Sequence, residues 1–276
     1  MSKLECNVCH HHCKLSENQT GLCKARSNSG GKIVPVNYGE ITGFALDPIE
    51  KKPLRHFYPG SKILSVGSFG CNLKCSFCQN HEISTVGKGE IRTQYAPPGD
   101  LIQIALDLIS RGNIGIAYTY NEPLIGYEYV RDCAVLARKH KLKNVVVTNG
   151  CFNGEILNEL APYIDAFNID LKGFGDKFYK SIGGDFELVK SFIKAAYNNA
   201  HIEITTLIIP GENDSEEEIA SLSDFIASID KEIPLHISRF FPCYEMKDKK
   251  PTDIKKVYAL AKTARRKLKY VYEGNC

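Results

Sequence analysis

The sequence has no long hydrophobic run and little net charge. No stretch of about 18 apolar residues occurs, so we expect no membrane-spanning helix. Residues 1–6 lack the apolar core of a secretory signal, which predicts a cytoplasmic protein. The formal net charge of the 276 residues is only +3, which does not favour nucleic-acid binding. With 43% hydrophobic residues, the chain is expected to bury one large core beside a small appendage.

Cysteine, in contrast, is abundant. The chain has 11 cysteines, and in a cytoplasmic protein such a set favours metal ligation or redox chemistry over disulfides. Most of them fall into two spaced groups, namely Cys6, Cys9, Cys13 and Cys23 near the N-terminus, and Cys71, Cys75 and Cys78 further along. The two groups have different numbers of thiols, so we expect different kinds of site.

The second group has C-x3-C-x2-C spacing and follows a predicted strand within residues 65–80. Three thiolates hold three corners of a [4Fe–4S] cube, whereas a closed cluster takes four, so one iron is expected to lack a protein ligand. Catalytic zinc sites keep an open position in the same way. A buried thiol cluster without metal is disfavoured, because three thiols on a glycine-flanked loop are poorly placed for a core.

The first group offers four thiols in a short segment that also contains three consecutive histidines, 10–12. Four ligands predict a closed site, and the thiols suit structural zinc and a second iron–sulfur cluster equally. Three thiolates and one imidazole would also suit zinc. Residues 1–60 are turn-rich and are predicted to form a cysteine-rich metal-binding unit with a connector, followed by a main domain at 61–276.

From residue 62 onward, β-rich runs alternate with helical patterns, which predicts an α/β fold made of βαβ units with a parallel sheet. The predicted strands are 63–69, 114–120, 143–149, 164–171, 202–209, 234–241 and 270–273. The predicted helices are 98–111, 124–140, 153–161, 185–199, 214–230 and 252–268.

The strands have polar residues on the face that is expected to point inward. In the strand at 164–171, Asn168 and Asp170 alternate with apolar neighbours, and the later strands show the same period of two. A closed eight-stranded barrel has an interior packed with aliphatic side chains. We therefore predict an incomplete barrel of about six strands with a wide, wet lumen that holds a ligand.

Polar residues at the carboxyl ends of the strands are the candidate site, because active groups collect there in barrel folds. The candidates are Asn121 and Glu122, Thr148 and Asn149, Asp170 and Lys172, and His236. For His236, a role as a base, a role in ligand contact and a structural role are all open at this stage.

Cys71, Cys75, Phe77 and Cys78 form a C-x3-C-x-aromatic-C motif that resembles the signature of radical S-adenosylmethionine (SAM) enzymes. The resemblance implies an incomplete (β/α)6, TIM-like barrel. It also implies that SAM chelates the open iron, that one electron cleaves SAM to a 5′-deoxyadenosyl radical, and that the aromatic ring packs beside the adenine.

The same resemblance implies roles for three further residues. Glu122 occupies the place of a Gly-Gly-Glu-Pro-like sequence that contacts the methionine amino group in that family. The Asp170-x-Lys172 pattern is similar to that of glycyl-radical-enzyme activases. There it implies that Lys172 meets the SAM carboxylate and that Asp170 meets the ribose or a peptide substrate.

Several segments together resemble the AmmeMemoRadiSam-system radical SAM enzymes, which are related to pyruvate formate-lyase activating enzymes. These segments are 47–54, 56–61, 71–80, 117–123, 210–214 and 238–242. The resemblance implies hydrogen abstraction from a protein or peptide, as glycyl-radical activation or another modification. It also implies AMMECR-type and Memo-type protein partners and a reductant such as flavodoxin or ferredoxin. Alternatives from other classes are an iron–sulfur electron carrier without SAM chemistry and a zinc-ribbon interaction protein.

Overall fold

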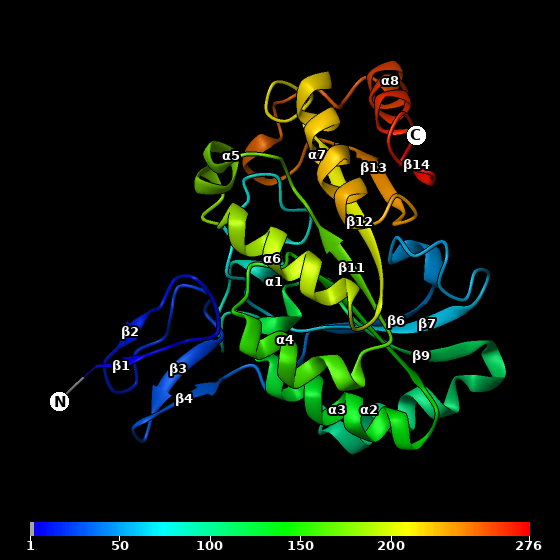
Figure 1. The fold of residues 1–276 in the computed structure, drawn as a ribbon. Coiled ribbons are helices and arrows are strands. Elements are labelled where there is room, and N and C mark those ends of the chain that lie inside the picture. The colour runs from blue at the N-terminus through cyan, green and yellow to red at the C-terminus, as the bar shows by residue number, and fades with distance from the viewer. Residues whose placement is uncertain (1–2) are drawn as a thin grey trace.

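An eight-stranded, mostly parallel sheet organises the computed structural model, which describes residues 3–276 (Figure 1). The strand order is β14-β13-β12-β11-β10-β9-β7-β6. All neighbours pair in parallel except β6 and β7, which are antiparallel. The strands are β6 (Gly43–Pro48), β7 (Lys62–Gly67), β9 (Asn113–Tyr118), β10 (Lys143–Thr148), β11 (Ala166–Asp170), β12 (His201–Ile208), β13 (Leu235–Arg239) and β14 (Val271–Gly274). The predicted open α/β barrel is confirmed.

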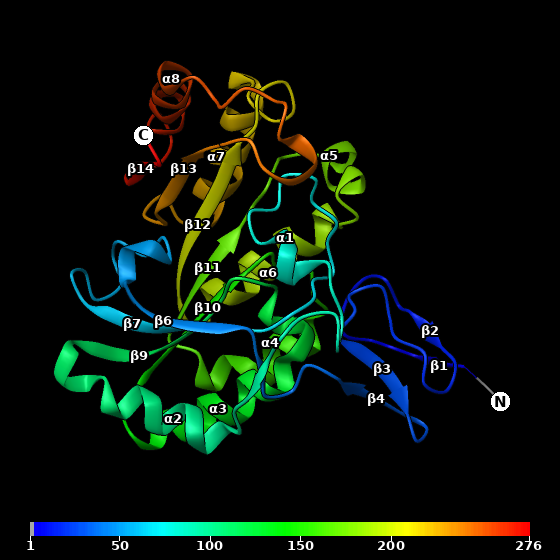
Figure 2. The ribbon, with the colours of Figure 1, turned by 180° about the vertical axis from the view of Figure 1, so that it is seen from behind.

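The helices cover the outer face of the curved sheet, as the two opposite views show (Figures 1 and 2). The longer ones are α2 (Pro98–Asp107), α3 (Tyr127–Lys139), α4 (Gly154–Leu160), α6 (Phe186–Tyr197), α7 (Glu216–Ile229) and α8 (Ile254–Ala264). All six lie within the predicted ranges. The short helices α1 (His81–Ser84) and α5 (Asp176–Ser181) were not predicted, because so few residues show no clear helical period.

Helix caps explain two of these boundaries. The Ser215 side chain accepts a hydrogen bond from the backbone N–H of Glu218 at the start of α7. The Asp185 side chain accepts one from Leu188 at the start of α6. Each cap satisfies a backbone donor that has no partner within its helix, so each helix starts where the sequence provides an oxygen.

Strand β6 comes from the part of the chain that was predicted to belong to the N-terminal unit. It pairs with β7 along its whole length, from Gly43 opposite Gly67 to Pro48 opposite Lys62. The predicted division at residue 60 therefore falls after a strand of the main sheet. The period of a strand indicates which side chains share a face, but it does not indicate the partner strand.

The N-terminal unit consists of two small hairpins that project from one side of the barrel (Figure 1, blue). Its strands are β1 (Leu4–Glu5), β2 (Lys14–Leu15), β3 (Arg26–Ser29) and β4 (Lys32–Pro35), and beyond it β5 (Glu40–Ile41) pairs with β8 (Gln94–Tyr95). A buried ion pair attaches the unit to α3, with the Arg26 guanidinium 2.6 Å from the Glu128 carboxylate. Because this charge-assisted contact joins the N-terminal unit to a helix of the barrel, it helps to fix the orientation of the unit.

The connector between β6 and β7 fills the amino-terminal end of the barrel interior. Its side chains Ile49, Leu54 and Phe57 are buried against Ala117 and Val145, which point inward from β9 and β10. These residues form a small apolar cluster separate from the main core on the helix side. The interior is thus packed at this end.

The polar inward residues at the same end bind the connector instead of a ligand. Both carboxylate oxygens of Glu203 accept backbone N–H groups, from Arg55 at 3.0 Å and from His56 at 2.7 Å. The Asn168 side chain donates to the carbonyl of Pro53 at 2.9 Å. The predicted wide, wet lumen is therefore found at the carboxyl end, whereas the amino end is filled by the connector.

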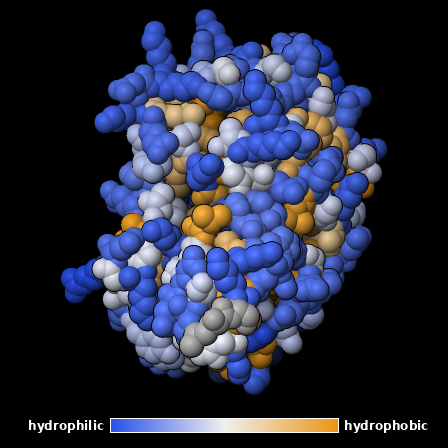
Figure 3. All heavy atoms as spheres, turned by 90° about the vertical axis from the view of Figure 1, so that its left-hand side faces the viewer, coloured by the Kyte–Doolittle hydropathy of each residue, from blue (hydrophilic) through white to orange (hydrophobic). Residues whose placement is uncertain are grey.

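No helix among residues 3–276 is long and apolar enough to cross a membrane. The face shown in Figure 3 is mostly hydrophilic, with hydrophobic groups reaching the surface near its centre.

Candidate active site

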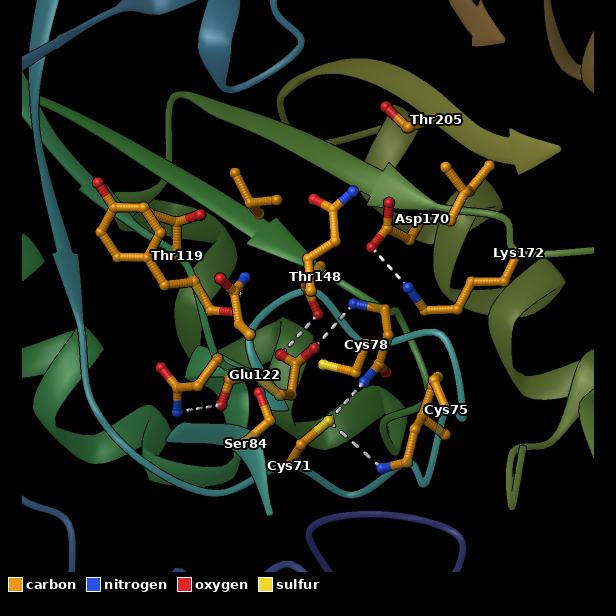
Figure 4. Close-up of a pocket in the computed structure, with 18 of the residues that line it drawn as sticks. Cys71, Cys75, Cys78, Ser84, Thr119, Glu122, Thr148, Asp170, Lys172 and Thr205 are labelled. Carbon is orange, nitrogen blue, oxygen red and sulfur yellow. Dashed lines mark hydrogen bonds and ion pairs between the residues drawn. The ribbon is translucent and has the colours of Figure 1, made fainter. Parts of the chain in front are cut away.

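A cavity of about 330 Å³ opens at the carboxyl ends of the parallel strands. It gathers every predicted residue of the main-domain site except His236, so residues far apart in the sequence meet there. The predicted residues in its lining are Cys71, Cys75, Phe77, Cys78, Asn121, Glu122, Thr148, Asn149, Asp170 and Lys172. In Figure 4 Asp170 and Lys172 lie above the three cysteines.

The cysteine loop leaves β7 through a turn that only glycine fits. Gly70 has a φ of +86°, and a Cβ there would lie 2.4 Å from the carbonyl oxygen of Cys23. Beyond it, the Cys71 sulfur accepts the backbone N–H of Leu73 at 3.4 Å, and the N–H of Cys78 donates to the carbonyl of Cys75. The three thiols are therefore held on one tight loop at the cavity wall.

The chemistry of these thiols fits an iron–sulfur cluster. Burial raises the pKa of Cys71 well above its ordinary value and raises the pKa of Cys75 to about 11. Neutral thiols are thus preferred unless a cation stabilises the thiolates. Three thiols around one cavity, with a backbone N–H aimed at the Cys71 sulfur, supply such a site with one corner of a cube open to the cavity.

Glu122 connects the ends of β9 and β10. One carboxylate oxygen accepts from the Leu124 amide at 3.0 Å and the Thr148 hydroxyl at 2.8 Å, and the other accepts from the Asn149 amide at 2.8 Å. Burial raises the pKa of Glu122 to about 7 in spite of these hydrogen bonds. Near neutral pH the group therefore accepts or releases a proton easily, and it lines the cavity beside the cysteines.

Asparagine side chains hold the loops around the cluster site. The side-chain oxygen of Asn121 accepts from the backbone N–H of Ser68 at 3.0 Å. Its amide nitrogen donates to the carbonyls of Phe69 and Gly70, both at 3.1 Å. These contacts let Asn121 position the cysteine loop. The residue also lines the cavity, and its contact with a ligand stays a prediction.

Asn149 and Asn72 extend this network. The amide of Asn149 donates to the Asn72 oxygen at 2.8 Å and lies 3.8 Å from the Cys71 sulfur. Asn72 in turn donates to the carbonyl of Cys151 at 2.9 Å. The sequence analysis missed Asn72, although its place directly after Cys71 was a usable signal.

Asp170 and Lys172 form an ion pair at the end of β11, with 2.8 Å between the ammonium and the carboxylate. Burial acts to lower the pKa of Lys172, but the charge of Asp170 outweighs it and the pKa is raised. The lysine is therefore a stable cation in the cavity wall. Asp170 keeps a second oxygen for another donor, so the pair presents both signs of charge to a ligand.

Phe77 follows the cysteine spacing and lies at the cavity wall. Its side chain is buried, lines the cavity and stacks on Phe178, with 6.2 Å between the ring centroids. The Phe178 ring thus holds the Phe77 ring in place, while Phe77 lines the cavity. This arrangement suits contact between Phe77 and a flat aromatic group.

His236 lies outside the cavity lining. It is buried at the closed end, where its Nε2 is 2.6 Å from the Glu203 carboxylate. Its ring also stacks on Tyr272, with 5.5 Å between centroids. Of the roles open from the sequence, these contacts correspond to the structural one.

Lysines of the connector also reach the cavity, and the sequence analysis missed them. Lys52 is buried, lies 2.9 Å from the Asp47 carboxylate and 4.6 Å above the ring of Tyr120. Burial lowers the pKa of Lys52, while its hydrogen bond to Asp47 opposes this. The exposed Lys51 lies beside it in the lining. A charged stretch between two prolines at 48–53 was the available signal.

The N-terminal cysteines lie apart from this cavity. Cys6, Cys9, Cys13 and Cys23 line a separate small void of about 10 Å³ within the N-terminal unit. The structure thus brings the four together, as their spacing predicted.

Residues 65–223 match the Radical SAM superfamily, which is more than half of the chain. The chain therefore belongs to the radical SAM superfamily, whose members use a [4Fe–4S] cluster and SAM.

Comparison with individual relatives shows which members of the superfamily the chain is similar to. It is 38% identical to an uncharacterised protein of Methanocaldococcus jannaschii over 99% of this chain and 82% of that protein. It is 26% identical to the pyruvate formate-lyase-activating enzyme of Clostridium pasteurianum, over 58% of this chain and 67% of that enzyme. The 4-hydroxyphenylacetate decarboxylase activating enzyme of Clostridioides difficile is also 26% identical, over 54% of this chain and 47% of that enzyme. The chain is thus homologous to glycyl-radical activating enzymes.

Solved structures share the fold. A domain of the pyruvate formate-lyase-activating enzyme from Bacteroides vulgatus superposes with a TM-score of 0.52 at 17% identity, over 58% of this chain and 99% of that domain. SuiB of Streptococcus suis bound to SAM gives a TM-score of 0.58 at 19% identity, over 75% of this chain and 48% of SuiB.

Proposed function

We propose that this chain is an activating-type radical SAM enzyme that binds SAM in the carboxyl-end cavity and takes a hydrogen atom from a protein or peptide. One observation supports this most directly. The Cys71, Cys75 and Cys78 thiols line the same cavity as the Asp170–Lys172 ion pair. An electron carrier has no need of such a pair beside its cluster, and an interaction protein has no need of the cavity.

In this proposal the three cysteines hold a [4Fe–4S] cluster, which supplies the electron that reductively cleaves SAM to a 5′-deoxyadenosyl radical. Lys172 binds the carboxylate of the SAM methionine, because its ammonium is a cation kept in the wall by Asp170. The free oxygen of Asp170 binds a ribose hydroxyl or the substrate backbone. Phe77 packs beside the adenine.

Glu122 orients the amino group of SAM. With a pKa of about 7 it is partly ionised near neutral pH, and an approaching ammonium favours the carboxylate form. Thr148 and Asn149 face the ribose while they hold Glu122 by their hydroxyl and amide groups. These residues bind and orient, and the closed amino end of the barrel keeps water from entering behind the ligand.

For the substrate, we propose a protein within the AmmeMemoRadiSam system, with AMMECR-type and Memo-type proteins as partners. The connector segment 47–61 contributes strongly to that resemblance, and in the structure it provides Lys51 and Lys52 to the cavity. Homologous activating enzymes are named for the enzymes that they activate. Glycyl-radical installation is our first candidate reaction and another protein modification the second, with flavodoxin or ferredoxin as reductant.

The cleavage step is tested with anaerobically reconstituted protein, dithionite and SAM. We expect 5′-deoxyadenosine from the wild type and none from Cys75→Ala. Cys133→Ala is the matched control, because Cys133 is buried in α3 outside the cavity lining, and it should retain cleavage. Persisting cleavage in Cys75→Ala would overturn the ligand assignment.

The substrate is tested by isotope transfer. AMMECR-type and Memo-type proteins produced in deuterated medium are added to the reaction, and 5′-deoxyadenosine is analysed by mass spectrometry. Deuterium in the product identifies the hydrogen donor. Cleavage without deuterium from either protein would leave the SAM chemistry intact but would exclude both as substrates.

A further inference from the structure

A second group of charges lies at the floor of the active-site cavity, next to the connector. We call the side chains of Asp47, Lys51, Lys52 and Tyr120 the floor cluster. Asp47 lies opposite Ile63, near the start of β7, whereas the cysteine loop follows the end of β7 at residue 67. Four residues of strand separate these two levels by roughly 13 Å. The floor cluster is therefore distinct from the cysteine end of the cavity.

The Asp47 carboxylate is shared among three donors. Its Oδ2 accepts from the Lys52 ammonium and from the Tyr120 hydroxyl, both at 2.9 Å, and its Oδ1 lies 3.4 Å from the Lys51 ammonium. Burial acts to raise the pKa of Asp47, but the hydrogen bonds from Lys52 and Tyr120 lower it to about 2. The carboxylate is thus charged near neutral pH. Two ammonium groups and one carboxylate leave the floor cluster with one excess positive charge.

The Lys52 ammonium has more donors than acceptors. It carries three N–H groups, its side chain is only 4% exposed, and Asp47 is its one hydrogen-bond acceptor within residues 3–276. The Tyr120 ring, 4.6 Å away, stabilises part of the charge. Even so, burial lowers the pKa of Lys52, whereas the pKa of Lys172 is raised beside Asp170. Because Lys52 lines the cavity, a ligand can supply the acceptor that the protein does not.

The Tyr120 ring is held in position for this contact. Tyr120 has a φ of +73°, in the left-handed region that a tyrosine rarely adopts. The Asn80 side chain donates to its carbonyl at 2.7 Å, and its ring lies over Gly67, where a Cβ would be 2.8 Å from the ring. Backbone strain of this kind persists where the surrounding structure fixes it, and it is concentrated at ligand sites. The floor cluster is therefore a preorganised part of the cavity.

The cavity thus offers cations at two levels. In the proposed function, Lys172 binds the SAM carboxylate at the level of the cysteines. The Lys52 ammonium is tied to Asp47 at the floor, so the two lysines do not share one carboxylate. SAM has a single carboxylate and no other anionic group. An anion at the floor must therefore come from the other reactant, which is the substrate.

The floor can be reached from the side of the barrel. The sheet does not close, and its edge strands β6 and β14 lie on the same side of the molecule in two opposite views (Figures 1 and 2). The cavity lining includes Lys51, after β6, and Asn275, after β14. The Lys51 side chain is 68% exposed, and residues 43–45 of β6 are exposed as well. A chain segment can therefore approach Lys51 from solvent, with Lys52 behind it.

We propose that Lys51 and Lys52 bind a carboxylate of the substrate, so that the hydrogen donor belongs to an acidic peptide segment. The inference rests on the proposed function, in which the substrate is a protein or peptide. An acidic side chain and a chain terminus both provide this carboxylate. Its binding at the floor places the adjoining residues of the segment between the floor cluster and the cysteine loop, where the hydrogen atom is taken.

Calorimetry with three synthetic peptides tests the site. Each has seven residues, mostly glycine and alanine. The first has a central glutamate and blocked ends, the second a central glutamine and blocked ends, and the third the glutamine with a free C-terminal carboxylate. The titrations use anaerobically reconstituted protein with SAM and without dithionite, so that no cleavage occurs. At least one carboxylate peptide should bind about 10-fold or more tightly than the neutral one, through charge-assisted hydrogen bonds, and it identifies the source of the carboxylate.

Lys51→Met/Lys52→Met should abolish this preference, because methionine keeps much of the side-chain packing and removes the charge. Lys143→Met is the matched control. Lys143 lies 3.1 Å from the Asp165 carboxylate and 5.5 Å from the centroid of the Tyr58 ring, but outside the cavity lining. It should keep the full preference. If circular dichroism shows that the double variant does not fold, the exposed Lys51→Met decides, and it should lower the preference by about threefold.

Three results of the titrations would overturn the proposal: equal affinity for all three peptides, no binding of any of them, or an unchanged preference in the variant that decides. SAM affinity that falls about 10-fold or more in this variant would also overturn it, because the lysines would then hold the SAM carboxylate. A lack of 5′-deoxyadenosine in the cleavage assay refutes the proposed function instead. The peptide titrations need no cleavage, so the two failures are distinguishable.

Discussion

The two ends of the barrel interior are polar for different reasons. At the carboxyl end, Asp170 and Lys172 form a pair that faces an open cavity. At the amino end, Glu203 and His236 form an equally close pair that faces the connector. The comparison shows that a polar inward face is not by itself a binding site. What distinguishes the two ends is whether the protein's own backbone already satisfies the polar atoms.

Substitution of Glu203 is expected to have the largest effect on stability, because its side chain is fully buried and accepts hydrogen bonds from the amides of Arg55 and His56. Glu203→Ala should lower the free energy of unfolding by about 3–5 kcal/mol, since the amides and His236 lose their partner. Urea unfolding followed by circular dichroism measures this. As a control, Glu217→Ala at an exposed position should change the free energy of unfolding by less than about 1 kcal/mol. A Glu203→Ala variant with wild-type stability and lost SAM affinity would place a ligand at the closed end.

The acid response of Glu203 supports the same assignment. Burial acts to raise its pKa, but hydrogen bonds from His201, His236 and the two connector amides lower it to about 2, from 4.5. Because the folded pKa is depressed, this stabilisation is present above pH 4.5 and is lost as the pH falls toward 2. Wild type and Glu203→Ala should therefore converge in stability over this range, and comparing the two cancels any effect of acid that both proteins share.

Substitution of Lys172, at the open end, is expected to have the second-largest effect, and this effect is on SAM binding. Lys172→Met should weaken SAM binding by about 10- to 100-fold, because a charge-assisted hydrogen bond to the carboxylate is lost. Anaerobic calorimetry with SAM measures the affinity. Lys172→Arg should recover part of it, since it keeps the positive charge. Unchanged affinity in Lys172→Met would remove the functional distinction between the two ends.

His236 provides the smallest effect. His236→Asn should cost about 1 kcal/mol of stability, through loss of one hydrogen bond at the closed end, and it should leave the rate of SAM cleavage within about twofold. Thermal unfolding and 5′-deoxyadenosine formation are measured on the same preparation. A rate that falls tenfold or more while the protein stays folded would restore His236 as a candidate base.

Much of the active site follows from local sequence. The C-x3-C-x2-C spacing places three thiols on one loop, and the pattern Asp170-x-Lys172 places two charges on one face of a strand because side chains alternate. Strand ends could also be located from the βαβ alternation, so Glu122 and Thr148 were expected near the cysteines. The sequence could not show that the Asn121 amide also holds backbone groups of the cysteine loop, because those contacts join segments about 50 residues apart.

By itself the sequence determined the parallel barrel, the grouping of three cysteines on one loop and the polarity of the inward face, because these depend on residue type and on periods of a few residues. Only the tertiary structure decided which polar residues remain free for a ligand. The contact between Glu203 and the His56 amide joins positions 147 apart in the chain. The pairing of β6 with β7 and the packing of the connector inside the barrel likewise depend on long-range contacts, which a local pattern does not specify.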